Sequence, residues 1–383
     1  MVKIKSIETV KGFSILIILI SNSINYWLIF GDDMQDIYGF IITILEVIGP
    51  ALYIFVISFS ISFTLDKKMG TYPKKANRNK IFKQAFFLIS IGILYNIIIN
   101  PNLAIPLNLW GWNILIFLGF SQIICYLAYK LVRWVRLVIG LFIIFLTPGI
   151  RELLFIVKDT NLLMNAIHFV IVSPFPNYSL LPFASICFFS TVFGEYTFES
   201  ISLNSNRANL RSTQSIIKYG LVLLFCGFIL PFIDIGLVVN AENFDPSIYP
   251  FQEAVPLLVA HNILYVSGLP LFLLKGTPSF LFLCMGLALL IIGIFYYYSD
   301  VLHNKSRLCN SFDMFGRHSI TIFFLQYLFV WILYQKVTIV WYFPFLLLYL
   351  AIFGVLFFLW QENHNSILSL DWIMNKISGK TED

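Results

Sequence analysis

The chain has 383 residues, of which 59% are hydrophobic and only 12% are charged, and its formal net charge is +5. Average soluble domains carry about 25% charged residues, so this composition excludes a soluble globular protein. The mean hydropathy of +0.84 indicates an integral membrane protein. Its apolar segments are continuous runs of helical length without regular alternation, which favours an all-α helical bundle over a β-barrel.

Ten apolar runs predict about ten transmembrane helices. They lie at 12–30, 38–64, 82–100, 113–131, 135–149, 178–196, 216–238, 279–299, 318–336 and 339–360. The fifth run ends at Pro148 and is short for a crossing. The interval 152–173 that follows is interrupted by charged residues, so we expect an amphipathic or re-entrant element there.

Loop charges predict the orientation, because cytoplasmic loops are enriched in Lys and Arg. Five stretches are basic, and they lie before residue 12 and at 66–80, 130–136, 207–218 and 305–317. The intervening loops, at 31–36, 101–108 and 239–277, are acidic or nearly uncharged. This alternation predicts one membrane domain over 1–383 with both termini in the cytoplasm. The net charge therefore reflects membrane orientation and indicates no nucleic-acid partner.

The end of the chain predicts one further helix. At about 365–378, apolar residues recur at helical spacing, while Asp371 and Lys376 fall elsewhere on the helix. Such a segment is typical of an amphipathic helix that lies on a membrane surface. We expect it on the cytoplasmic side.

The first run carries polar side chains at membrane depth, namely Ser21, Asn22, Ser23 and Asn25. An unsatisfied amide or hydroxyl costs several kcal/mol there, so these groups are expected to face protein or a water-filled cavity. Asn22 and Asn25 are three residues apart and lie on roughly one helical face. We therefore expect this helix to form one wall of a functional site.

Other runs also contain polar residues, and most have a structural interpretation. Amides within membrane helices often hydrogen-bond to neighbouring helices, which is the expectation for Asn96, Gln122 and Gln326. A carboxylate near mid-membrane costs at least about 2.5 kcal/mol, so for Glu46 a functional and a structural role both stay open. The pair Arg317-His318 begins the ninth run and is suited either to an anionic phosphate or to lipid head groups.

Motifs of soluble enzymes are absent from the sequence. It contains no P-loop, dinucleotide fingerprint, zinc-protease motif or nucleophile elbow. The five cysteines are scattered and mostly fall inside apolar runs, which predicts neither a disulfide framework nor a metal site. Any chemistry must then come from polar groups at membrane depth.

The opening stretch combines an acidic residue, a basic residue followed by glycine, and an apolar helix with an amide; these are Glu8, Lys11-Gly12 and Asn22. This pattern resembles the first span of the membrane acyltransferases related to heparan-alpha-glucosaminide N-acetyltransferase. Further segments resemble that family in order along the chain, at 79–102, 112–124, 175–195, 275–290 and 315–329. The resemblance covers most of residues 6–335.

Three departures from the family pattern concern the chemistry. Lys11 stands where the family has arginine, and Gln326 stands where it usually has a histidine. The family generally has a histidine in or just after the first span, whereas this chain has none before His168.

The resemblance implies an enzyme that takes an acetyl group from acetyl-CoA on the cytoplasmic side and passes it to an amine or hydroxyl acceptor, often a sugar, across the membrane. Such chemistry needs a base, donors for the thioester oxyanion and cations for the CoA phosphates. The candidate catalytic residues are Asn22, Asn25 and Glu46. The candidate donor-binding residues are Lys11, Lys80, Arg317, His318 and Gln326.

The general base is left open by the sequence. Asn22 is suited to an oxyanion donor, because asparagine is no base at neutral pH. Either Asp32, Asp33, Glu46 or His168 is the base, or the chain keeps the fold and has lost or changed the reaction. The alternative function is a transporter or a lipid or glycan flippase that uses the same polar cavity.

The expected partners are membrane lipids, acyl-CoA and a sugar or lipid-linked acceptor, and a homodimer is compatible with the sequence. The richness in Ile, Phe, Asn and Lys indicates an AT-rich microbial genome. The expected location is therefore the plasma membrane of a prokaryote.

Overall fold

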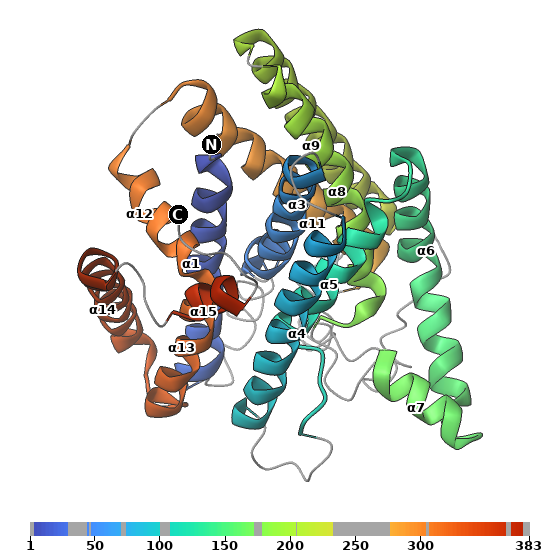
Figure 1. Ribbon diagram of the computed structural model, residues 1–383. Helices are drawn as coiled ribbons and strands as arrows, with labels where there is room; N and C mark the ends of the chain where they lie inside the picture. Colours follow the sequence, from blue (N-terminus) through green and yellow to red (C-terminus); the bar gives the residue numbers. More distant parts are fainter. Residues whose placement is uncertain are drawn as a thin grey trace.

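A computed structural model of the chain describes residues 4–29, 44–45, 47–69, 74–99, 108–171, 178–203, 205–232, 276–303, 306–364 and 369–377. These residues form helices and connecting turns, with no β-strand among them (Figure 1). The prediction of an all-α membrane bundle is confirmed.

Seven of the described helices are long and apolar enough to cross a membrane. They are α1 (Lys5–Trp27), α4 (Lys74–Ile99), α6 (Arg133–Val157), α8 (Leu180–Ser202), α9 (Asn206–Ile229), α11 (Pro278–Tyr296) and α14 (Ile339–His364). The second, fourth and ninth predicted runs overlap α3 (Pro50–Met69), α5 (Ile114–Ala128) and α13 (Ser319–Leu333). Every predicted run thus overlaps a helix, while the count of ten crossings and their orientation stay predictions.

The remaining described helices are short. They are α7 (Leu162–Ile171), η2 (Leu230–Phe232), η5 (Tyr297–Val301), α12 (Arg307–Arg317) and α15 (Leu370–Ile377). The sequence analysis predicted α15 as the amphipathic tail helix. It did not predict α12, which leads directly into α13.

The fifth predicted span is longer than expected. α6 continues through Pro148 and ends at Val157, 25 residues in all. A proline within a helix removes one backbone donor but does not always end the helix. The interval 152–173 is therefore divided between the last turns of α6 and α7, whose 10 residues are too few to cross a bilayer.

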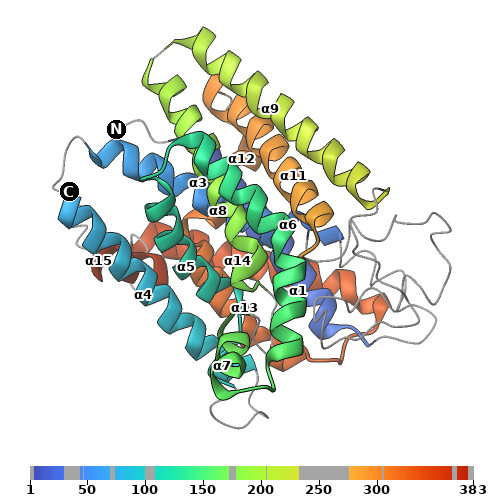
Figure 2. The same cartoon turned by 90° about the vertical axis from the view of Figure 1, so that its right-hand side faces the viewer.

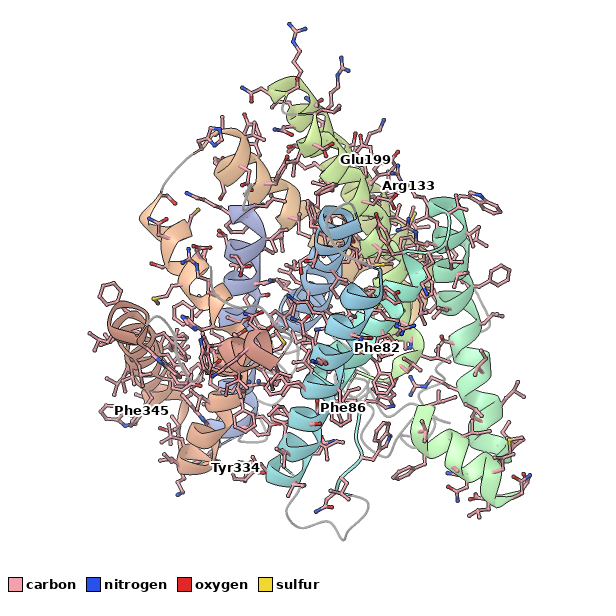
Figure 3. The ribbon with its side chains drawn as sticks, viewed as in Figure 1. Phe82, Phe86, Arg133, Glu199, Tyr334 and Phe345 are labelled. Carbon is pink, nitrogen blue, oxygen red and sulfur yellow. The ribbon has the colours of Figure 1, made fainter. Side chains whose placement is uncertain are left out.

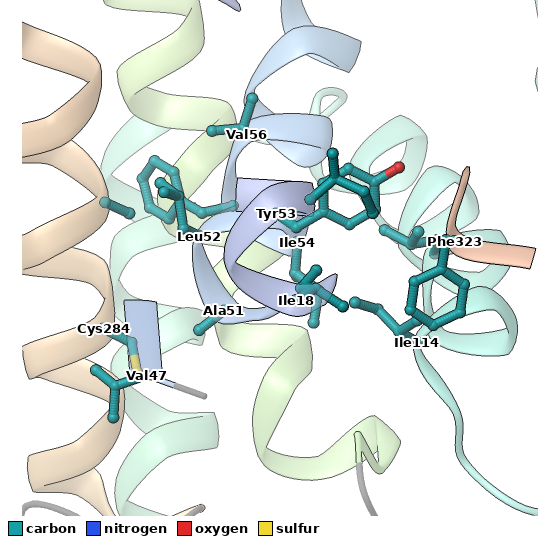
Figure 4. Close-up of a cluster of buried hydrophobic side chains, with 14 of the residues drawn as sticks. Ile18, Val47, Ala51, Leu52, Tyr53, Ile54, Val56, Ile114, Cys284 and Phe323 are labelled. Carbon is teal, nitrogen blue, oxygen red and sulfur yellow. The ribbon is translucent and has the colours of Figure 1, made fainter. Parts of the chain in front are cut away.

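The core forms where α3 is surrounded by other helices. Tyr53 of α3 is completely buried, and Ile18 of α1, Ile114 of α5 and Phe323 of α13 gather around it (Figure 4). A helix that is apolar on all sides is expected in the middle of a bundle. By contrast, side chains of α4 and α14 such as Phe86 and Phe345 point away from the bundle, toward the expected position of lipid (Figure 3).

A second extensive contact joins α9 and α11, which run alongside each other (Figure 2). Glycines line this contact, and a Cβ on Gly286 would come within 2.8 Å of the carbonyl oxygen of Gly220. Small residues of this kind let two membrane helices approach closely.

Candidate functional site

Two glycines far apart in the sequence bring α1 and α12 into backbone contact. A Cβ on Gly12 would overlap the carbonyl oxygen of Phe312 and lie 2.9 Å from the backbone nitrogen of Gly316. A Cβ on Gly316 would overlap the carbonyl oxygen of Glu8. Only glycine fits at either position, because backbone atoms occupy the space of a side chain. The motifs Lys11-Gly12 and Gly316-Arg317 therefore form one helix crossing.

Beyond this crossing, α13 follows α1 to its other end. The backbone N–H groups of Gln335 and Val337 donate to the carbonyl oxygens of Tyr26 and Trp27, at 2.8 and 2.9 Å. The backbone N–H of Ile29 donates in turn to the carbonyl oxygen of Val337 at 3.0 Å. α1 and the α12–α13 segment thus run in the same direction and are fixed to each other at both ends.

Asn22 and Gln326 occupy equivalent places between these two fixed ends. Each lies ten residues beyond the glycine of its own segment. From Gly12 to Asn22 this is about 15 Å along one helix, whereas a turn at His318 separates α12 from α13 between Gly316 and Gln326. The Asn22 side chain is partly buried and makes no hydrogen bond with any residue in the described part of the chain. The neighbouring Ser23 instead shares a 2.9 Å hydrogen bond with Tyr342 of α14. The Asn22 amide is therefore available to a ligand.

Gln326 has an amide that is buried and unsatisfied. Its side chain is 1% exposed, and neither its oxygen nor its nitrogen has a hydrogen-bond partner among the described residues. The interhelical hydrogen bond expected for Gln326 is thus not found there. An unpaired buried polar group costs about 1–3 kcal/mol, so this amide is suited to a bound molecule with both a donor and an acceptor.

Asn96, in contrast, has the structural role predicted for it. Its amide nitrogen donates to the carbonyl oxygen of Gly111 at 2.9 Å. Asn113 donates to the side-chain oxygen of Asn96 at 2.7 Å and to the carbonyl oxygen of Gly92 at 2.8 Å. These bonds join α4 to the start of α5. The side-chain oxygen of Gln122 has no hydrogen-bond partner within the described ranges.

Two other candidate catalytic side chains, Asn25 and Glu46, lie outside the described residues, as do Asp32 and Asp33. His168 is described, and it lies on α7. Figure 1 shows α7 at the side of the bundle away from α1. The structure therefore does not bring His168 to the wall that carries Asn22.

The candidate donor-binding cations lie near the glycine crossing and on α4. Lys11 forms an ion pair with Glu8 at 3.4 Å, and both side chains are about one-fifth exposed, at 18% and 22%. Arg317 pairs with Asp313 one turn earlier and is 41% exposed. Lys80, near the start of the described side chains of α4, is partly buried.

His318 is separated from this group of cations by its surroundings. It is 2% exposed, and its ring stacks with the rings of Phe357 and Trp360 of α14, with centroid distances of 5.4 and 6.4 Å. Arg317 and His318 are thus neighbours in sequence but do not form a single cationic pair. The aromatic rings around the imidazole fix the junction of α12, α13 and α14.

Sequence reasoning missed a polar contact between α13 and α15. The Asp371 carboxylate accepts hydrogen bonds from the hydroxyl and the backbone N–H of Thr321, at 2.9 and 3.2 Å. The backbone N–H of Leu370 donates to the same hydroxyl at 2.9 Å. Close by, the hydroxyl of Tyr53 donates to that of Ser319 at 2.8 Å. Helical spacing placed Asp371 off the apolar face of its helix, but no sequence signal identified Thr321 as its partner.

Burial raises the pKa of Asp371 from its usual 3.8 to about 6. The hydrogen bonds from Thr321 and the charge of Lys11 act in the opposite direction, and Glu8 adds a smaller increase. Because the Thr321 N–H belongs to the first turn of α13, the carboxylate also lies at the positive end of that helix.

A second charged cluster joins α6 to α8. Arg136, whose side chain is 2% exposed, pairs with Glu195. Arg133 pairs with Glu195 at 3.0 Å and with Glu199, and Figure 3 shows Arg133 and Glu199 at the same end of the two helices. The sequence analysis treated both arginines only as orientation signals. Their partners indicate that they hold α6 against the bundle.

Comparison with known proteins identifies the family. The model of the heparan-alpha-glucosaminide N-acetyltransferase catalytic family matches residues 3–231, which is more than half of the chain. The match begins just before α1 and ends before α11 to α15. No curated protein and no solved structure matches the chain. The family resemblance inferred from the sequence motifs is thereby confirmed, and the segments 275–290 and 315–329 lie outside the matched residues.

Proposed function

The chain belongs to the heparan-alpha-glucosaminide N-acetyltransferase catalytic family, and from this membership we propose that it is a membrane-bound acyltransferase. The donor is acyl-CoA, with acetyl-CoA as the expected form, which enters from the cytoplasm. The acceptor is a sugar, glycan or lipid carrying an amine or hydroxyl group at the outer side of the membrane.

The arrangement of α1 and α13 is the observation that carries this proposal. The Gly12–Gly316 crossing brings the two basic motifs of the family pattern together at one end of the two helices. Asn22 and Gln326 follow at matching positions farther along, and their amides have no hydrogen-bond partner in the described residues. Cations at one end and unsatisfied amides within the membrane are what a phosphate-bearing donor with a long amide arm needs.

The chemistry of each side chain then suggests its role. Lys11, Lys80 and Arg317 bind the phosphates of the donor. The Gln326 amide pairs with an amide of the pantetheine arm. The Asn22 amide donates to the carbonyl oxygen of the thioester as negative charge develops there. A bond forms between the acyl carbon and the acceptor nitrogen or oxygen, the carbon–sulfur bond breaks, and the acceptor proton passes to a base and finally to the departing CoA thiolate.

An acetyl-transfer assay tests this function directly. The purified full chain, in lipid nanodiscs, is incubated with radiolabelled acetyl-CoA and with lipid and glycan extracts as acceptors. Asn22→Ala is expected to lower transfer on the order of a hundredfold, since one oxyanion donor contributes that much or more. Asn206→Ala, at the exposed start of α9, serves as the matched control and is expected to leave transfer unchanged.

Three outcomes contradict the proposal. If the purified wild-type chain did not bind CoA, acyl-CoA would not be its donor. If Asn22→Ala left the rate of transfer unchanged, α1 would not form the wall of the catalytic site. Movement of a glycan or lipid across the membrane without any dependence on acyl-CoA would identify a transporter or flippase in place of an enzyme.

A further inference from the structure

The C-terminal helix α15 lies among the groups assigned to the donor. It contacts α13 and α4, and Figure 1 shows it in red between these two helices. α13 begins two residues after Arg317, and α4 carries Lys80. The positive charge of Lys11 acts on Asp371 of α15 and lowers its pKa. Lys80 thus belongs to a helix that contacts α15, Arg317 lies two residues before another, and Lys11 is near enough for its charge to act on Asp371.

Polar contacts and partial apolar burial together hold α15 in place. None of its eight residues is fully buried, although Leu370 and Met374 pack against the hydrophobic core. Its first turn is fixed by Ser369, whose hydroxyl accepts from the backbone N–H of Trp372 at 3.0 Å, and by the two bonds between Asp371 and Thr321. A helix of this length is not stable by itself in water, so its order depends on these contacts. Segments held by few buried contacts open at low free-energy cost.

The groups that face Asp371 come from several helices. α1 contributes the cation Lys11 and the anion Glu8, and α3 contributes the neutral phenol Tyr53. α13 contributes the hydroxyl and N–H of Thr321, with Ser319 nearby. α4 carries Arg78, Lys80 and Lys83 among its described side chains. In the docked position, Lys11 and the donors of Thr321 stabilise the Asp371 carboxylate, but burial outweighs them and favours the protonated form.

We propose that α15 is a lid over the cytoplasmic entrance of the donor site, held closed by the contact between Asp371 and Thr321. The inference rests on the proposed function, since it takes an anionic acyl donor to enter beside α13. When α15 is docked, its carboxylate accepts hydrogen bonds from Thr321 and interacts with the charge of Lys11. When α15 moves away, these groups can bind the phosphates of acyl-CoA. The lid and acyl-CoA therefore compete for the same groups.

The lid is expected to respond to pH. Burial raises the pKa of Asp371 to about 6 when α15 is docked, whereas an exposed aspartate titrates near 3.8. The docked helix therefore holds its proton more tightly than the released one, and docking is strongest at low pH. It weakens as pH rises between about 4 and 6 and changes little above that range. Donor binding is accordingly expected to tighten over the same interval.

The experiment measures CoA binding to the purified full chain by titration calorimetry. At pH 7, Asp371→Ala and Thr321→Val are each expected to lower the apparent Kd by about three- to tenfold, because the open form is more populated. The double variant should bind no more tightly than either single variant, since both remove one contact. Lys376→Ala, at the exposed end of α15, is the control and should leave the Kd unchanged.

A conservative variant tests the charge itself. Asp371→Asn keeps an oxygen that accepts from Thr321 but resembles the protonated carboxyl at every pH. It is expected to keep α15 docked and to bind CoA as weakly at pH 7 as the wild-type chain does near pH 4. If α15 is a lid, CoA affinity should no longer depend on pH in either Asp371→Asn or Asp371→Ala. At pH 7, the first variant should lower the affinity for CoA and the second should raise it.

Hydrogen exchange separates the lid from general unfolding and from failure of the proposed function. Faster exchange confined to residues 369–377 in Asp371→Ala is expected. Wild-type binding of CoA with unchanged or weaker binding in Asp371→Ala would overturn the lid alone. Absence of CoA binding in the wild type and in every variant would overturn the proposed function, and the lid with it.

Discussion

Gly12 and Gly316 meet backbone against backbone where α1 crosses α12, and neither position has room for a Cβ. Gly12→Ala is therefore expected to destabilise the chain by about 3 kcal/mol or more, because the overlapping atoms belong to a helix backbone and cannot rotate away. Gly149→Ala and Gly354→Ala are matched controls, since a Cβ at either site meets nothing within 4 Å. Thermal unfolding in detergent measures the difference, and equal melting temperatures would contradict the crossing.

Substitutions of Asn113 and Asn22 are expected to have different effects, the first on stability and the second on activity. Asn113 accepts from the backbone N–H of Ile116 at the start of α5 and donates to Gly92 and Asn96. Asn113→Ala removes this cap and leaves polar groups unpaired, for an expected cost of about 1–3 kcal/mol. Asn22→Ala breaks no hydrogen bond to a described residue. It should change the free energy of unfolding by less than about 0.5 kcal/mol. A large loss of stability in Asn22→Ala would show that its amide has a structural partner.

Gln326→Leu exchanges an unsatisfied amide for an apolar group of similar size. Since both amide atoms are buried without partners in the described residues, the change is expected to stabilise the chain by about 1–2 kcal/mol. If the amide binds the donor, the same variant loses CoA affinity. Melting temperature and CoA titration on one preparation measure the two effects. A loss of stability together with unchanged CoA affinity would identify Gln326 as a structural residue.

Arg136 and Arg133 provide a second matched comparison. Both pair with Glu195, but the side chain of Arg136 is 2% exposed and that of Arg133 is 38% exposed. Arg136 also donates from Nε to the carbonyl oxygen of Leu131 at 3.1 Å. Arg136→Met is expected to cost about 2–3 kcal/mol, because charged hydrogen bonds away from water are strong. Arg133→Met should cost less than about 1 kcal/mol, as exposed ion pairs do. Similar melting temperatures for the two variants would argue against a buried role for Arg136.

The sequence predicted the helices well, because apolar length alone decides where a chain crosses a bilayer. It was wrong at Pro148, where a loop signal lies inside a helix that continues for more than two turns. Proline is a weaker stop signal within a membrane bundle than in water, since neighbouring groups stabilise the backbone around it.

The candidate site was predictable only in part. Asn22 and Gln326 were recognised because amides at membrane depth are costly. Their alignment depends on the contact between Gly12 and Gly316, and no single-chain pattern pairs residues that far apart. Asp371 was recognised as a polar residue of an amphipathic helix. Its bond to Thr321 is a tertiary contact between two segments that helical periodicity treats independently.

The contact of α1 with α12 and α13 also has a consequence for how the protein is made. α1 leaves the ribosome long before α12, the helix that packs most extensively against it. The serines of α1 and Asn22 therefore lie in the translocon or in lipid until residues 312–342 are synthesised and complete the wall.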